Sequence, residues 1–194
     1  MLGPKKTSAT QPIPVWQKVL ETAYGGFTLD KTGLTDGMLI PGGSPFGYDE
    51  STRKARVIKQ ATMFSDAGGT DTAYNVKKGH NLAIGEYISP AVGGKAYAIT
   101  AIDITTYADH DVVTVGTSLG AALTGAVLFQ SSATGATAGA LIVAPRGLSY
   151  EDYYVEDNKD VAITLRGTVF ERRVPATLAA IKALMPNIIY SQSY

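Results

Sequence analysis

Two short patterns combine residue types that could carry out a reaction. The pattern G-x-S-x-G, in which a sharp turn exposes a serine nucleophile, occurs at residues 116–120 with Ser118 at its centre. In α/β-hydrolases the acidic residue and then the histidine follow this serine, but His80 and His110 both precede Ser118. The chain order therefore argues against that class of enzyme, and we interpret the pattern as a glycine-rich turn.

The second pattern contains possible metal ligands. Asp109, His110 and Asp111 are consecutive, and Asp103 lies close by in the sequence. Two carboxylates beside one imidazole suit a hard or borderline cation. Alternate residues of a turn rarely converge on one ion without further ligands, and the chain has neither an EF-hand pattern nor H-E-x-x-H. We therefore expect a solvated turn and no metal site.

Nucleotide and thiol chemistry have no support in the sequence. Lys95 follows a Gly-Gly pair, but Ala96 stands where a P-loop needs Ser or Thr, and no G-x-G-x-x-G pattern occurs. The chain has no Cys, which excludes disulfides, thiolate metal sites and thiol nucleophiles. We expect no catalytic residue, no cofactor and no enzymatic activity.

Composition narrows the class of protein further. The 194 residues include 17 Lys+Arg and 17 Asp+Glu, so the formal net charge is zero, which argues against a general nucleic-acid coat. Charged residues make up 18%, below the usual value of roughly 25%. The uncharged stretch 112–145 is broken by glycines and hydroxyl residues, so we expect no membrane span. A soluble protein with so few charges often covers part of its surface with copies of itself or with partners.

Three basic clusters and one acidic cluster remain as candidate contact surfaces. Lys77-Lys78 precedes His80 in a predicted turn, Arg172-Arg173 follows a predicted strand, and a third basic cluster spans 53–56. The acidic segment 151–157 contains Tyr153 and Tyr154. Such clusters are either solvated loops or complementary patches that orient neighbouring subunits or a partner.

The spacing of turn signals predicts a mainly β fold. The chain has 21 Gly and 9 Pro, and turn residues recur about every 8–12 positions between short β-branched runs, as in small barrels and sandwiches. A helix is predicted only after Pro175, where apolar residues recur on one face until Pro186. The expected fold class is thus mainly β with one C-terminal helix (α+β), containing a small antiparallel β-barrel or sandwich module.

The same signals divide the chain into three parts. Residues 1–44 are punctuated by Pro and Gly and read as an extended N-terminal arm, which carries Trp16 and Phe27. These aromatic side chains are large, so we expect the arm to dock on a surface. Residues 45–149 read as a β-rich module made of a hairpin and a small barrel. Residues 150–194 read as a strand–helix–strand segment that packs on it.

Several segments resemble a family of virus proteins. The segments are 47–55 (GYDESTRKA), 74–80 (YNVKKGH) with 84–86 (IGE), 163–175 (ITLRGTVFERRVP) and 186–191 (PNIIYS). They resemble capsid-associated proteins of tailed bacteriophages of gut Bacteroides, including crAss-like phages, which are head decoration, auxiliary capsid or head-fibre proteins. The resemblance spans roughly residues 45–194. It implies a non-enzymatic virion protein on the outer face of the major capsid protein, commonly a homotrimer, and it brings no active site.

We therefore expect a capsid accessory protein that is assembled in the host cytoplasm, resides on the virion surface and binds neither nucleic acid nor membrane. Its partners would be the major capsid protein, further copies of itself and other head-surface or fibre proteins. Alternatives are a tail or head–tail joining protein, a carbohydrate-binding β module, or an enzyme using Ser118 or His110. The expected capsid or subunit contacts are Trp16, Phe27, His80, Tyr153, Tyr154, Arg172 and Arg173.

Overall fold

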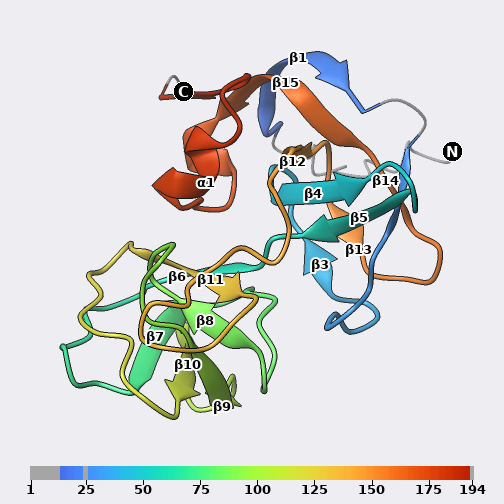
Figure 1. Ribbon diagram of the computed structural model, residues 1–194. Helices are drawn as coiled ribbons and strands as arrows, with labels where there is room; N and C mark the ends of the chain where they lie inside the picture. The colour runs from blue at the N-terminus through green and yellow to red at the C-terminus, as the bar shows by residue number, and fades with distance from the viewer. Residues whose placement is uncertain (1–13, 24–25, 193–194) are drawn as a thin grey trace, which may run out of the picture.

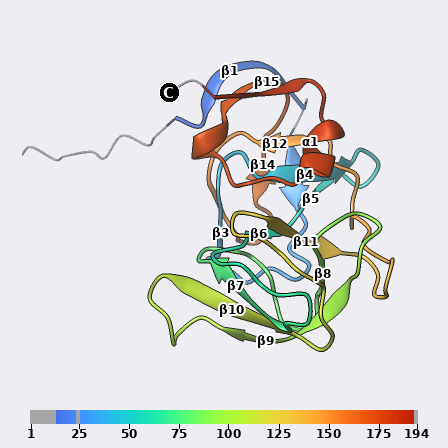
Figure 2. The same ribbon diagram turned by 90° about the vertical axis from the view of Figure 1, so that its left-hand side faces the viewer.

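The computed structural model describes residues 14–23 and 26–192. The described chain forms two β lobes, one built from both ends of the chain and one from its middle (Figure 1). Figure 2, turned by 90°, shows the lobes stacked one above the other. Strands dominate and the described residues contain a single short α-helix, so the expected mainly β class with one C-terminal helix is confirmed.

An eight-stranded sheet forms the first lobe. Its strand order is β1-β15-β12-β4-β5-β2-β14, with β16 pairing in parallel with β15. A separate two-stranded ladder joins β3 to β13 in the same lobe. The strands are β1 (Trp16–Thr22), β2 (Phe27–Leu29), β3 (Leu39–Ile40), β4 (Pro45–Asp49), β5 (Lys54–Val57), β12 (Gly147–Ser149), β13 (Tyr153–Tyr154), β14 (Asp160–Val161), β15 (Ile163–Phe170) and β16 (Ile188–Ser191).

The hairpin of β4 and β5 follows directly from its turn residues. Asp49 accepts hydrogen bonds from the backbone N–H and the hydroxyl of Ser51, at 2.8 and 2.7 Å, which is the local bonding that favours Asp in turns. Arg53 then adopts a left-handed backbone conformation with φ of 55°. The turn thereby sets the register that pairs Phe46 with Val57, and both of these side chains are buried.

A six-stranded antiparallel sheet forms the second lobe and curls into a half-barrel. Its order is β6-β11-β8-β9-β10-β7, and the end strands approach each other at a bridge between Met63 and Val76. The strands are β6 (Gln60–Thr62), β7 (Ala73–Lys77), β8 (Tyr87–Ser89), β9 (Tyr97–Asp103), β10 (His110–Val115) and β11 (Val127–Ser131).

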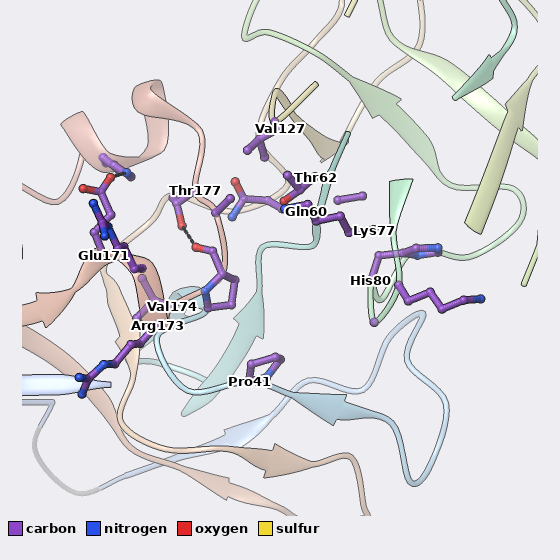
Figure 3. Close-up of a pocket in the computed structure, with 18 residues that line it drawn as sticks. Pro41, Gln60, Thr62, Lys77, His80, Val127, Glu171, Arg173, Val174 and Thr177 are labelled. Atoms are coloured by element: carbon purple, nitrogen blue, oxygen red, sulfur yellow. Dashed lines mark hydrogen bonds and ion pairs between the residues drawn. The ribbon is translucent and has the colours of Figure 1, made fainter. Parts of the chain in front are cut away.

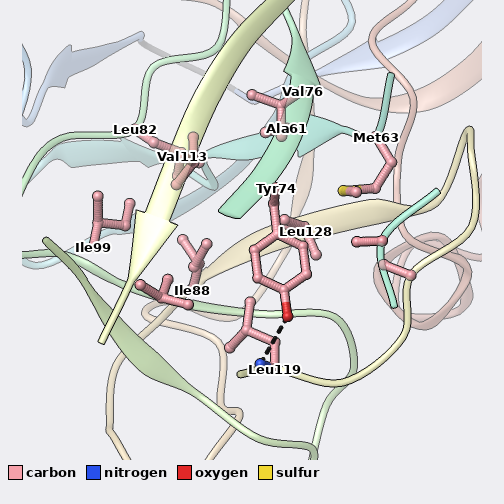
Figure 4. Close-up of a cluster of buried hydrophobic side chains, with 13 residues drawn as sticks. Ala61, Met63, Tyr74, Val76, Leu82, Ile88, Ile99, Val113, Leu119 and Leu128 are labelled. Carbon is pink, nitrogen blue, oxygen red and sulfur yellow. Dashed lines mark hydrogen bonds between the residues drawn. The ribbon is translucent and has the colours of Figure 1, made fainter. Parts of the chain in front are cut away.

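Tyr74 lies in the centre of the curled sheet (Figure 4). Its ring is surrounded by aliphatic side chains of this lobe. Its hydroxyl accepts a hydrogen bond from the backbone N–H of Leu119 at 2.8 Å and donates to the carbonyl of Gly120 at 3.1 Å. A buried tyrosine needs such partners, and here they attach the 116–120 loop to the core.

A third apolar cluster joins the two lobes. It contains Ile58, Phe129, Leu148 and Ile181, which come from the connection between the lobes, from β11, from β12 and from α1 (Ala179–Ala183). The helix begins later than the sequence predicts, because the residues after Pro175 remain extended up to Leu178. Its short apolar face nevertheless closes the junction between the lobes.

The predicted division of the chain differs from the observed one. Residues 14–23 and 26–44 supply β1, β2 and β3 of the first lobe, so this part is not an arm that extends away; residues 1–13 lie outside the described residues. The hairpin of β4 and β5 also belongs to the first lobe, and the second lobe consists of β6 to β11. The physical reason is strand pairing: β1 pairs with β15, and β2 pairs with β5 and β14, which buries Phe27 inside the first lobe.

The buried side chain of Lys59, in the connection between the lobes, contacts both lobes through an ion pair with Glu86 and a hydrogen bond to Gly33. Lys59, whose side chain is 1% exposed, follows β5. Its Nζ lies 2.5 Å from Glu86 Oε1 in the second lobe and donates to the carbonyl of Gly33 in the first lobe, also at 2.5 Å. Glu86 Oε2 accepts the backbone N–H of Ala83 at 2.9 Å. Gly33 has φ of 73°, and a Cβ there would lie 2.7 Å from Glu86 Oε1.

Replacing Lys59 with methionine should destabilise the protein strongly. The change keeps an apolar chain of similar length but leaves the Glu86 carboxylate largely buried without its cation. Removal of one partner from a buried pair lowers the free energy of unfolding by about 3–5 kcal/mol. Denaturant unfolding of the wild type, Lys59→Met and the exposed control Lys95→Met measures this loss. Equal loss in both variants would contradict the special role of Lys59.

Candidate functional site

A groove of about 710 Å³ lies between the two lobes and is the candidate site (Figure 3). One wall consists of β6 and the turn after β7, and the other consists of the 3₁₀ helix η1 (Glu171–Arg173) and the extended residues that follow it. The polar and charged lining residues are Gln60, Thr62, Lys77, Lys78, His80, Glu171, Arg172, Arg173, Thr177 and Lys182.

This groove brings together expected contact residues that are distant in the sequence. The turn that carries His80 lies on one wall, and Arg172 and Arg173 lie on the other. Antiparallel pairing of β7 with β10 positions the first, and the end of β15 positions the second. Neither the short basic clusters nor their spacing indicates that they would line one cavity.

The groove carries more cations than carboxylates. Glu171 is the lining carboxylate, and it pairs with Lys182 at 2.5 Å and accepts a hydrogen bond from Gln192. Lys78 pairs with Asp111 of β10 at 2.7 Å. Lys77 forms no ion pair with any carboxylate among the described residues. A positive surface therefore remains on a chain whose formal net charge is zero.

The two adjacent arginines of η1 are exposed at the outer rim. Arg173 donates a hydrogen bond to the carbonyl of Pro14 at 3.1 Å, and its guanidinium lies 4.3 Å from the centre of the Phe170 ring. These partners are a neutral oxygen and an aromatic face, so they orient the guanidinium without neutralising it.

His80 contributes its backbone to the groove but directs its ring away from the opposite wall (Figure 3). Its Nδ1 accepts the backbone N–H of Leu82 at 3.3 Å, and its Nε2 lies 3.5 Å from Asp111 Oδ2. The side chain is 5% exposed, and this burial lowers the pKa of His80, although Asp111 acts in the opposite direction. The ring therefore supports the turn from within.

Gln60 is a feature of the groove that no sequence signal marks. Its Oε1 accepts the backbone N–H of Leu178 at 2.9 Å, which fixes the orientation of the amide. Its Nε2 is then directed away from that bond and is buried without an acceptor. An unsatisfied buried donor is unfavourable in a native structure. The sequence cannot reveal this unpaired nitrogen, because it results from the bond between Gln60 Oε1 and Leu178, the residue that precedes α1.

Trp16 lines a second cavity, of about 580 Å³, together with Tyr150, Glu151 and Asp152. Its indole N–H donates to the carbonyl of Tyr150 at 2.8 Å, which ties β1 to the loop after β12. The Trp16 side chain is half-buried beside β15, whereas Tyr150 is exposed. The expected docking of Trp16 thus occurs within the chain itself.

Phe27 is a core residue, which corrects its expected role as a surface contact. It is 2% exposed, and its ring packs 4.4 Å from that of Tyr48, measured between ring centres. Arg53 covers the ring at 4.2 Å. The reason is the parallel pairing of β2 with β5, which places this strand inside the first lobe.

Tyr153 is likewise in the core, whereas its neighbour Tyr154 is 61% exposed. Successive residues of a strand face opposite sides of a sheet, so only one of the pair can be a surface contact. The Tyr153 hydroxyl accepts the backbone N–H of Ala162 at 2.8 Å, and burial raises the pKa of this phenol. Tyr154 keeps its expected place on the surface.

Ser118 and His110, the residues considered for an enzymatic role, do not line the groove. Ser118 Oγ donates to the carbonyl of Gly69 at 3.0 Å and accepts the N–H of Gly120 at 3.1 Å, as a turn residue does. The His110 ring stacks between Phe64 and Tyr107, with ring centres 4.9 and 4.3 Å away. His110 Nδ1 lies 2.7 Å from the carboxylate of Asp109.

Two other kinds of site are absent from residues 14–23 and 26–192. No group of three or more His, Asp or Glu side chains there is arranged to hold a metal ion. In the same residues, no helix has the length and apolar character needed to cross a membrane. Comparison of the chain with protein-family models, with curated proteins and with solved structures found no match.

The buried His80 ring predicts that stability falls in mild acid. Because its pKa is lower in the folded chain, the stability contributed by the neutral ring is present above about pH 6.5, the ordinary histidine pKa. It is lost as the pH falls from there toward the folded-state pKa, since the unfolded chain binds the proton more readily. Denaturant unfolding should show a larger loss between pH 7 and pH 5 for the wild type than for His80→Gln. Parallel pH profiles would contradict this.

Proposed function

We propose that this chain is an auxiliary structural protein of a tailed-bacteriophage head, which binds the outer surface of the capsid as a decoration or fibre-base protein. The carrying observation is the basic groove, whose lining includes the His80 turn on one wall and η1 with Arg172 and Arg173 on the other. Both segments belong to the stretches that resemble phage head proteins. The groove therefore supports the assignment of a docking surface for a capsid protein.

The surface outside the groove also supports a structural protein that acts by binding other proteins. Side chains that are large, apolar and more than half exposed occur on both lobes, at Leu20, Ile84, Leu123, Tyr154 and Ile189. Singly exposed apolar residues are ordinary, but here they accompany a low content of charged residues. Repeated weak contacts on a capsid lattice would add up, because each bound copy raises the effective concentration of the next contact.

Reversing the charge of the groove should reduce capsid occupancy. The variant Lys77→Glu/Arg172→Glu changes two exposed cations on opposite walls of the groove. Capsids stripped of the protein and incubated with this variant should retain roughly a tenth or less of the wild-type amount, because like charges at an interface repel. Quantitative gel analysis of sedimented capsids measures the occupancy.

Lys95→Glu is the matched control, because Lys95 is an exposed lysine that does not line the groove. It should bind capsids as the wild type does. Light scattering of each purified variant checks the assembly state, for which a homotrimer of the 20.4 kDa chain is expected. Full occupancy by the double variant, or failure of the wild type to bind capsids, would contradict the proposed role.

A second candidate function, carbohydrate binding, is favoured by the Trp16 cavity. Its walls combine two aromatic rings, those of Trp16 and Tyr150, with the carboxylates of Glu151 and Asp152. Asp152 Oδ1 already accepts the backbone N–H of Gly42 at 2.6 Å, which orients this carboxylate. An apolar platform beside fixed polar acceptors is the usual composition of a small-ligand site.

Tryptophan fluorescence tests this second candidate directly, since Trp16 is the only tryptophan of the chain. Titration with galactose and with N-acetylglucosamine should shift the emission if a sugar covers the indole. The variant Tyr150→Ala should weaken a genuine response by roughly 10-fold, as expected for loss of one aromatic anchor. An unchanged spectrum with both sugars up to molar concentration would remove carbohydrate binding from consideration.

A further inference from the structure

The groove between the lobes carries an excess of positive charge. Glu171 is the carboxylate of its lining, whereas the cationic lining residues are Lys77, Lys78, Arg172, Arg173 and Lys182. The amide of Gln60 belongs to the same lining, but its oxygen is held by Leu178 N–H and its nitrogen is buried, so a ligand meets the cations and not this amide. A ligand that complements the groove must therefore offer negative charge.

We infer that the groove binds an acidic peptide segment of a partner protein, whose carboxylates meet the lysine and arginine side chains of the lining. This inference rests on the proposed role of the groove as the docking surface and identifies the chemistry of what docks there. A carboxylate accepts several hydrogen bonds at once and forms charge-assisted bonds with lysine and arginine. The groove is about 710 Å³ and lies at the junction of the lobes, which leaves room for a chain segment rather than for an ion alone.

Two other anionic occupants fit the observations less well. A nucleic acid is normally met by a domain of high isoelectric point, whereas this chain has a pI of about 6.7 and no net charge. The acidic segment of a second copy is the other possibility. Three of its carboxylates are already engaged within the chain, because Asp152 binds Gly42, Glu156 binds Lys159 and Asp157 binds Lys31.

The N-terminal residues 1–13 of the chain are also a poor match on charge alone. They contain Lys5 and Lys6 and no carboxylate, so they would meet a groove of the same sign. A partner segment rich in Asp or Glu is thus the occupant that the charge of the groove favours.

Fluorescence polarisation with labelled peptides tests the inference in the absence of capsids. The full-length protein should bind a hexaglutamate peptide at least roughly 10-fold more tightly than a hexaglutamine peptide, because only the first carries charge. Added salt should weaken the binding, as screening requires. Lys77→Glu/Arg172→Glu should lower the affinity for hexaglutamate by roughly 10-fold or more, and Lys95→Glu should leave it unchanged.

Absence of hexaglutamate binding, equal binding of both peptides, or tighter binding of a short oligothymidine would overturn the inference. Capsid binding without peptide binding would refute the peptide chemistry alone, whereas peptide binding without capsid binding would refute only the proposed capsid role.

Discussion

The buried contact of Lys59 with Glu86 and Gly33 is the constraint on which the arrangement of the two lobes depends. Lys59 sits between β5 and β6, where the chain leaves one lobe and enters the other. Its ammonium group has to be paired in this buried position, and its two partners lie in different lobes. The hydrogen bonds of the ammonium group are directional and short-ranged, so they restrict the angle between the lobes in a way that the adjacent apolar cluster alone would not. The backbone of Lys59 adds a bond from Gln130 N–H at 2.9 Å.

The candidate groove is a consequence of that arrangement. One wall belongs to the half-barrel and the other to the segment between β15 and α1, so the cavity exists only while both lobes keep their relative position. Ile181 of α1 packs into the apolar cluster that joins the lobes, and this packing carries Lys182 and the preceding chain to the rim. Positive charge is thereby concentrated between the lobes of a neutral protein. Stability and the proposed recognition thus share one structural element, the junction.

Internal contacts account for most of the aromatic residues that looked suited to binding. Phe27 and Tyr153 fill the core of the first lobe, and Tyr74 fills that of the second. Trp16 is held by its bond to Tyr150 and remains beside an open cavity. Aromatic side chains bury large apolar areas, and a chain made of short strands needs them to complete two small cores. Among the described residues, the exposed aromatic side chains are those of Phe64, Tyr107, Tyr150 and Tyr154.

The sequence by itself determined the local structure: alternating apolar residues and turn chemistry were enough to predict the β4–β5 hairpin, most strands of the half-barrel and a helix before Pro186. These features depend on neighbours within a few residues, so their signals are present in short windows. The tertiary structure alone decided that residues 14–44 join the C-terminal strands, that Phe27 is buried and that Gln60 presents an unpaired donor. It also decided that the His80 turn meets Arg172 and Arg173 across one groove. Such outcomes depend on contacts between distant segments, and the packing energy that selects them is absent from any local pattern.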